Sequence, residues 1–76
     1  MKTCLIKLSS IQEVRDFVET VTRYDMEIDL SSGRYVVDAK SIMGIFSLDL
    51  MNPIKLTAYS DNTDKLFKEL ERFMVK

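Results

Sequence analysis

The sequence contains no histidine, and this absence excludes more chemistry than any other feature of its composition. Histidine is the commonest acid/base catalyst and metal ligand, and it can act as the nitrogen nucleophile for a phosphoryl group. The single cysteine cannot form an internal disulfide and has no neighbour at metal-ligand spacing, and the two glycines lie too far apart for a phosphate-binding loop. We therefore expect no catalytic residues, no metal and no cofactor, and the chain should not be an enzyme.

Long apolar runs and an excess of positive charge are also missing. No stretch approaches the roughly 18 apolar residues of a membrane span, and the N-terminal segment lacks the apolar core of a signal peptide. Eleven basic and twelve acidic residues leave a net charge of -1 without a basic stripe, so direct nucleic-acid binding is not expected. The sequence therefore predicts a single cytoplasmic domain over residues 1–76 that neither enters nor crosses a membrane.

Alternating apolar and polar side chains predict four strands, over residues 3–8, 26–30, 35–37 and 54–59. The first strand places Cys4 on the same face as Ile6, so we expect the thiol to be part of the core, as a small hydrophobe. The sequence Ser-Ser-Gly separates the second strand from the third and predicts a hairpin turn.

Apolar residues at helical spacing predict three helices. The first begins at Ser10, whose hydroxyl can accept from the N–H of Glu13 while the Glu13 carboxylate reaches back to the N–H of Ser10, as in a capping box. A short helix follows Ser41, and a long one carries the clearest stripe in the chain, at residues 66, 67, 70, 73 and 74. The element order predicts an α+β fold: a four-stranded, mostly antiparallel sheet with one face covered by two longer helices and one short helix.

The segment GRYVVDAKSIMGIFSLDL resembles the hairpin and short helix of HPr, the phosphocarrier protein of the bacterial sugar phosphotransferase system. KSIMG followed by SL is its most specific part. The resemblance continues through RYDMEIDL before it and IKLTAYS after it, so it covers nearly the whole chain. It implies the open-faced sandwich of the HPr family.

The resemblance is weakest where HPr proteins carry their phosphorylatable histidine, followed closely by an arginine and a proline. Without gaps, these positions fall on Ser10, Gln12 and Glu13. A serine phosphate ester would retain a phosphoryl group, and Glu13 would place negative charge beside it. The resemblance therefore implies a divergent protein without phosphocarrier activity, functionally closest to the catabolite-repression HPr-like proteins. The alternative is a phosphocarrier with a substitute acceptor such as Ser10 or Ser9.

The second HPr site is kept, because Ser41 matches the serine that an ATP-dependent kinase phosphorylates in HPr of many Gram-positive bacteria. A phosphate on Ser41 would lie at a helix N-terminus, which favours an anion by about 0.3 to 1 kcal/mol. The resemblance thus implies regulatory phosphorylation of Ser41, and the alternative is that this residue serves only as a helix cap.

The short helix after Ser41 has more apolar side chains than one buried face can use. Ile45 and Leu48 share one face, whereas Ile42 and Phe46 share another with Met43 at its edge. If the first pair enters the core, the second set forms an exposed patch, and exposed apolar patches usually mark contacts.

We expect Ile42, Met43 and Phe46 to dock a protein partner, which the resemblance implies to be a transport-system component, a kinase or a transcriptional regulator. Alternatively, the loop at residues 50–53 could fold over them. A third hypothesis is a structural role in self-association through the open sheet face, which carries Leu5 and Tyr59. The sequence leaves the oligomeric state open.

Overall fold

Four antiparallel strands form one sheet in the computed structural model, which describes residues 1–75. The strands are β1 (Lys2–Ile6), β2 (Glu27–Ser32), β3 (Tyr35–Asp38) and β4 (Ile54–Tyr59), and they lie in the order β1-β4-β2-β3. The sheet confirms the predicted α+β architecture, and β4 has the predicted bounds. Gly33 in the turn between β2 and β3 has a φ of 59°, and a glycine at this first position of a two-residue hairpin loop matches the right-handed twist of the strands.

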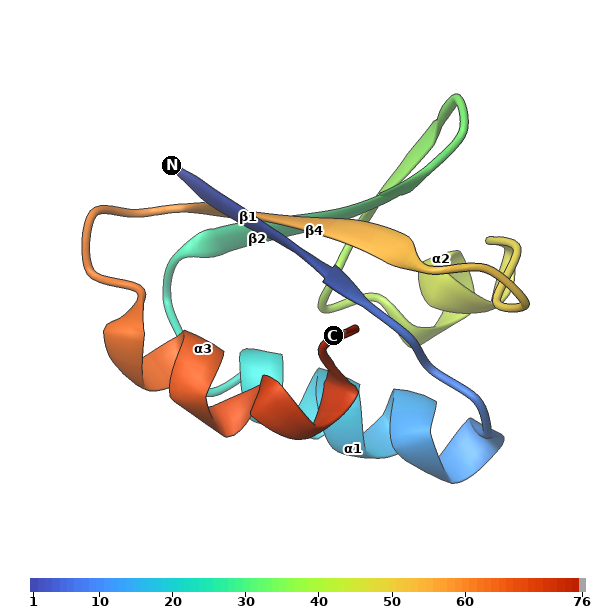
Figure 1. Cartoon of the computed structure of the whole chain (residues 1–76), viewed down its shortest axis with the longest axis horizontal. Helices are drawn as coiled ribbons and strands as arrows, with labels where there is room; N and C mark the ends of the chain where they lie inside the picture. The colour runs from blue at the N-terminus through green and yellow to red at the C-terminus, as the bar shows by residue number, and fades with distance from the viewer. Residues whose placement is uncertain (76) are drawn as a thin grey trace.

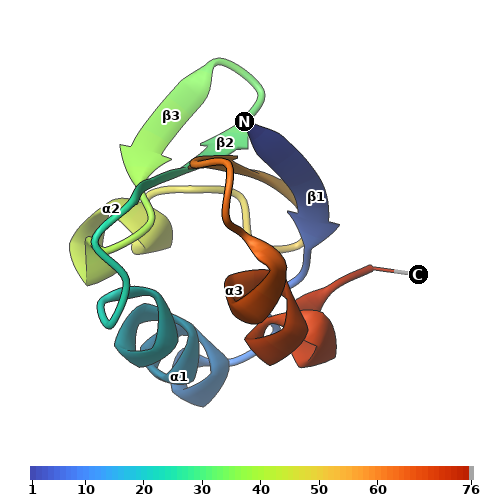
Figure 2. The same ribbon diagram turned by 90° about the vertical axis from the view of Figure 1, so that its left-hand side faces the viewer.

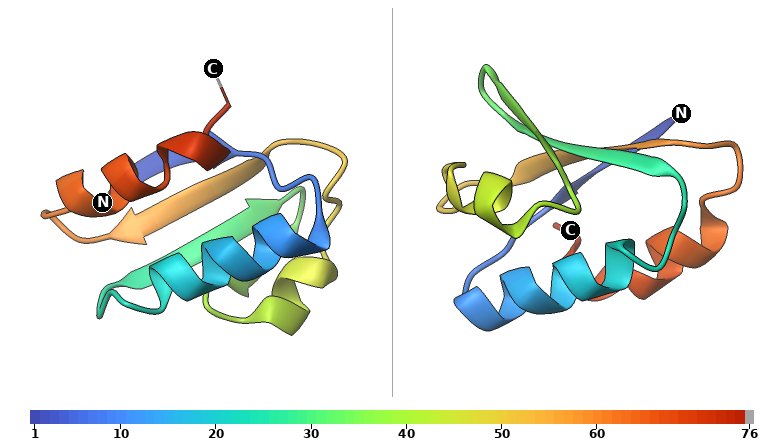
Figure 3. Two further views of the ribbon diagram at one scale, coloured as in Figure 1. Left: turned by 90° about the horizontal axis from the view of Figure 1, so that it is seen from below. Right: turned by 180° about the vertical axis from the view of Figure 1, so that it is seen from behind.

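The helices lie on one face of the sheet, as Figures 1 and 2 show. They are α1 (Ile11–Val21), α2 (Ile42–Phe46), α3 (Asp64–Glu69) and the short 3-10 helix η1 (Glu71–Phe73). Figure 3, seen from below, shows α1 and α3 extending across this face, with α2 near the end of α1 where that helix begins. No helix formed by residues 1–75 lies over the opposite face of the sheet, as predicted.

The predicted long terminal helix is wrong, because α3 stops before Leu70 and the chain continues as η1. The Lys7 N–H donates to the Phe73 carbonyl at 2.8 Å, and the Val75 N–H donates to the Leu5 carbonyl at 3.0 Å. A continued α-helix would use its own N–H and C=O groups internally and could not pair with β1 in this way. The terminal segment instead pairs with the end of β1 through one bridge, between Ile6 and Met74, and β3 forms the opposite edge of the sheet within residues 1–75.

The core lies between the inner face of the sheet and the helices. Phe17 of α1 and Phe73 of η1 are both buried, and their rings meet edge to face with centroids 5.7 Å apart. Although the helix is broken, Leu66, Leu70 and Phe73 of the predicted stripe are buried, and Phe67 and Met74 are partly buried against the core. Cys4 packs against this core but is only half-buried, and burial raises the pKa of its thiol.

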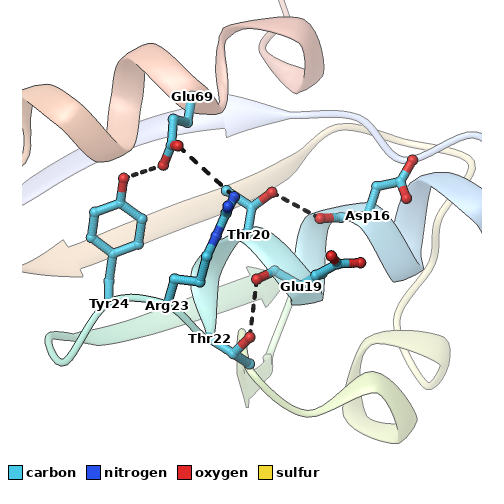
Figure 4. A network of polar contacts seen from close by, with 7 residues as sticks. All are labelled: Asp16, Glu19, Thr20, Thr22, Arg23, Tyr24 and Glu69. Atoms are coloured by element: carbon cyan, nitrogen blue, oxygen red, sulfur yellow. Dashed lines mark hydrogen bonds and ion pairs between the residues drawn. The ribbon is translucent and has the colours of Figure 1, made fainter.

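A polar network ties the end of α1 to α3, as Figure 4 shows. The Tyr24 hydroxyl donates to the Glu69 carboxylate, and the Arg23 guanidinium lies 3.8 Å from the same group. The hydrogen bond to Glu69 raises the pKa of Tyr24, because removing the phenol proton would place two negative charges together. Thr20 closes the last turn of α1 by donating to the carbonyl of Asp16 at 2.9 Å.

Candidate docking site between α1 and α2

The start of α1 is held by the two residues that the capping box predicts, with one difference in geometry. The exposed Ser10 hydroxyl accepts from the Glu13 N–H at 3.1 Å, as expected. The Glu13 carboxylate, however, accepts from the N–H of Ser9 at 2.6 Å and not from that of Ser10. The carboxylate therefore reaches one residue further back than predicted and provides an internal anion at the positive end of the helix.

Ser41 begins α2 in the same way. Its side chain is exposed and accepts from the Gly44 N–H at 3.1 Å, while its own N–H donates to the Asp38 carbonyl at 3.0 Å. The first turn of α2 contains no acidic residue, in contrast to the first turn of α1.

The buried face of α2 agrees with the sequence prediction, because Ile45 is fully buried and Leu48 is 6% exposed. Gly44 lets the helix pack closely on the sheet. A Cβ atom on this glycine would lie 3.1 Å from the Cβ of Val37 in β3, which is closer than carbon atoms ordinarily approach.

The outward face of α2 differs from the prediction at one of its three residues. Met43 is 76% exposed and Phe46 is 42% exposed, whereas Ile42 is half-buried and packs against the core. Ile42 precedes the buried Ile45 by three residues, so the two side chains are neighbours on the helix surface, and this explains its burial. The exposed apolar surface of α2 is therefore formed by Met43 and Phe46.

A groove of about 510 Å³ joins the end of α2 to the start of α1. It brings Phe46 together with the predicted Ser10, and its other lining residues are Lys7, Leu8, Ser9, Ile11, Leu50 and Met51. We call this surface the α1/α2 groove. Ser41 does not line it, because Ser41 lies at the opposite end of α2 from Phe46.

Two exposed residues of the α1/α2 groove were missed by the sequence analysis. Ile11 is 64% exposed and Met51 is 81% exposed. Ile11 occupies the same helical stripe as the partly buried Val18, and only its place in the first turn leaves it uncovered. The loop that carries Met51 does not bury Met43 but forms a wall of the groove, and the Lys7 ammonium holds it by donating to the Met51 carbonyl at 2.7 Å.

The open face of the sheet carries Leu5 and Tyr59 as predicted, and each is about half exposed. They do not form a continuous apolar patch, because Leu5 lies opposite Lys55 and Tyr59 lies opposite Glu27. A hydrogen bond to the Asp29 carboxylate raises the pKa of Tyr59.

Residues 1–75 contain no group of three or more potential metal ligands placed to hold an ion. None of the helices in this part of the chain has the length and apolar character needed to span a bilayer.

Comparison with known proteins identifies the family. Residues 12–76 match the family described as "PTS HPr component phosphorylation site", and the chain therefore belongs to the HPr family of the phosphotransferase system. Proteins of this family carry phosphoryl groups between other proteins of that system rather than catalyse a reaction of their own. The match begins at residue 12, so it does not include Ser9 or Ser10.

Solved structures agree with this assignment. The chain is similar to HPr-C-His from Thermoanaerobacter tengcongensis, with 30% identity over 95% of this chain and 89% of that one and a TM-score of 0.80. It is also similar in fold to HPr from Bacillus anthracis, with 23% identity over 97% and 94% of the two chains and a TM-score of 0.72. The catabolite repression protein Crh of Bacillus subtilis matches at 23% identity over 95% and 90%, with a TM-score of 0.65.

Proposed function

We propose that this chain is a non-catalytic regulatory module of the HPr family that docks a protein partner through the α1/α2 groove and the adjoining Met43. The observation that carries the proposal is the exposure of Phe46, Ile11 and Met51 on one concave surface assembled from two helices and a loop. Exposed apolar surface of this kind marks contacts with other proteins. The partner is a phosphotransferase-system component, a kinase or a transcriptional regulator of the cytoplasm, and we expect neither nucleic acid nor a membrane to take its place.

The start of α1 supports a role without phosphotransfer. The 76 residues include no histidine, and Ser10 in the family position of that residue is used as a helix cap. The Glu13 carboxylate lies in the first turn and accepts from the N–H of Ser9, so an incoming phosphoryl group on Ser10 would meet a negative charge. Incubation with phosphoenolpyruvate and the first enzyme of the system should therefore leave the mass unchanged. A gain of about 80 Da, the mass of one phosphoryl group, would instead support a substitute acceptor such as Ser10 or Ser9.

Phosphorylation of Ser41 would regulate the docking. The hydroxyl is exposed at the N-terminus of α2, where a phosphate could accept from free N–H groups. Met43 is only two residues away, so the phosphate would add charge beside the apolar surface. HPr kinase with ATP should modify the wild-type chain and leave Ser41→Ala unmodified, and equal modification of both would reject Ser41 as the site.

The docking proposal is tested with three purified candidate partners from the same organism: the first enzyme of the phosphotransferase system, HPr kinase and the catabolite regulator. Each is titrated with the wild-type chain, Met43→Asp, Phe46→Asp and Leu5→Asp. Leu5 is half exposed like Phe46 but lies on the open sheet face, because it alternates with the inward-facing Cys4 and Ile6 in β1, so it provides the matched control.

At least one partner should bind, and the two α2 variants should bind roughly tenfold or more weakly, the loss expected for truncating a central interface residue. The Leu5 variant should bind as the wild-type chain does. If all three partners fail to bind, or if the α2 variants bind normally, the groove is not the docking site.

A further inference from the structure

The outer edge of β3 is a second exposed surface of this molecule, apart from the α1/α2 groove. Figure 2 shows β3 at the margin of the sheet, with no strand of residues 1–75 beyond it, whereas the terminal segment pairs with the end of β1 at Ile6. Two apolar residues of this short strand are largely exposed, Tyr35 at 71% and Val36 at 62%. An exposed sheet edge offers backbone groups to another strand, and β3 carries neither a proline nor a lysine that would prevent such pairing.

The backbone of Val36 has the orientation that edge pairing requires. Opposite pairs in an antiparallel ladder alternate between hydrogen-bonded and non-hydrogen-bonded positions. The Ala39 N–H donates to the Ile28 carbonyl at 2.9 Å, so by alternation Leu30 with Val37 is a bonded pair and Ser31 with Val36 is not. The N–H and C=O of Val36 therefore point away from β2, toward the open edge.

The charges on this edge are placed so that the β3 edges of two copies of the chain would be complementary to each other. Asp38, two residues after Val36, shares its face of the sheet, and Arg34 lies in the hairpin turn directly before the strand. In an antiparallel pair of two β3 strands centred on Val36, each Arg34 would lie at the end of its strand, beside Asp38 of the second chain. Opposite charges in this position stabilise a strand pair.

Neither charge has an oppositely charged partner within residues 1–75, although the Asp38 carboxylate accepts from the Lys40 N–H at 2.9 Å. Asp38 lies directly opposite Asp29 in the β2–β3 ladder, and like charges in that position destabilise a sheet. The ion pairs within residues 1–75 are Arg23 with Glu69 and Arg72 with Asp16, so neither Arg34 nor Asp38 belongs to one. The Arg34 guanidinium of a second chain would offset the repulsion between the Asp29 and Asp38 carboxylates.

From these observations we infer that β3 is a self-association surface, on which two copies of this chain pair antiparallel about Val36 and extend the sheet across a two-fold axis. Each copy contributes the same residues, as a two-fold interface requires. A contact of so few residues falls below the area of stable interfaces, so we expect a dissociation constant of roughly 0.1–1 mM. The surface is separate from the α1/α2 groove, and a dimer would leave both grooves free of the strand contact.

The test uses charge-reversed variants of the full chain, observed by sedimentation equilibrium and by the dilution dependence of amide NMR signals. Wild-type chain should associate in the stated range, with shifts concentrated at residues 34–38. Arg34→Glu alone and Asp38→Arg alone should each weaken association at least tenfold, because each homodimer then has like charges in opposition. An equimolar mixture of the two variants should associate again, because each strand of the mixed pair then meets opposite charges.

A second variant keeps the test decisive if Asp38→Arg fails to fold. Val36→Pro removes the N–H that points to the open edge but none of the hydrogen bonds between β2 and β3, so it should remain folded and monomeric. Three results would overturn the inference: a monomer at about 5 mM wild-type chain, above the whole range of the expected dissociation constant; association unchanged by Arg34→Glu and Val36→Pro; or association lost in Leu5→Asp or Phe46→Asp instead.

Discussion

Replacing Gly44 by alanine should destabilise this protein, although the same change stabilises most helices. In an ordinary exposed helix, the change from glycine to alanine gains about 1 kcal/mol. Here the new Cβ would lie 3.1 Å from the Cβ of Val37 and 3.2 Å from the Ser41 hydroxyl oxygen, both on short, rigid side chains close to the backbone. Overpacking of this kind costs about 1–3 kcal/mol, so the net effect should be a loss of about 1 kcal/mol.

Thermal unfolding provides the measurement. A loss of about 1 kcal/mol corresponds to a decrease in Tm of about 4–8 °C for a domain of this size. The protein should stay folded at room temperature, because the expected stability of a 76-residue domain is roughly 4–11 kcal/mol. The strain can be relieved only by moving α2 away from β3, so partner binding through Phe46 and Met43 should weaken as well.

Gly33→Ala is the matched control, because the two glycines differ in why they are needed. Gly33 has a φ of 59°, and no atom lies within 4 Å of the place where a methyl group would be, so alanine there costs about 1–2 kcal/mol through the backbone alone. It should lower Tm by a similar amount and leave partner binding unchanged. A rise in Tm for Gly44→Ala would refute the reasoning, since α2 would then be free to accept a side chain at its contact with the sheet.

Three further changes test the core, the helix network and the start of α1. Phe17→Ala should lower the free energy of unfolding by about 3–5 kcal/mol in urea, and a loss below about 1 kcal/mol would show that the site collapses around the cavity. Glu69→Gln should lower the pKa of Tyr24, measured by NMR titration, because a neutral amide no longer opposes the phenolate; an unchanged pKa would contradict that cause. With the native Glu69, the raised pKa means that this contribution to stability is present at neutral pH and is lost as pH rises beyond about 10. Glu13→Ala should cost about 1 kcal/mol of thermal stability through the lost cap, and Glu13→Gln, which can still accept a hydrogen bond, should cost less.

The strands and the first helix could be predicted because their signals are local. The alternation over residues 54–59 marks β4 with its observed bounds, and the serine at position 10 marks the start of α1. The break after α3 depends instead on hydrogen bonds between Lys7 and Phe73, residues at opposite ends of the chain. No periodicity within residues 64–74 contains that information, since the same side chains are buried in either conformation.

The candidate site could be predicted only in the parts that depend on local spacing along the chain. Helical spacing separates Ile45 and Leu48 from Phe46, and the structure confirms that division. Ile42 lies three residues before the buried Ile45 and four residues before the exposed Phe46, so spacing alone does not decide which of the two faces it shares. The groove depends on the approach of Met51 to the start of α1 in space, and the sequence places these two segments far apart.

The N-termini of α1 and α2, where the proposed function places the lost and the kept phosphorylation sites, have related electrostatics in this chain. At α1, the Glu13 carboxylate in the first turn accepts from the Ser9 N–H at 2.6 Å. At α2, the first turn contains no acidic residue, but the Asp38 carboxylate accepts from the Lys40 N–H, and Lys40 precedes Ser41 as Ser9 precedes Ser10. A phosphate adds about -1.5 to -2 charges at neutral pH, so it would meet a carboxylate near either serine, and at Ser10 that carboxylate belongs to the helix itself. Under the proposed function, the missing histidine and Glu13 thus act in the same direction: they favour a protein that could receive a regulatory phosphate at Ser41 without passing one on.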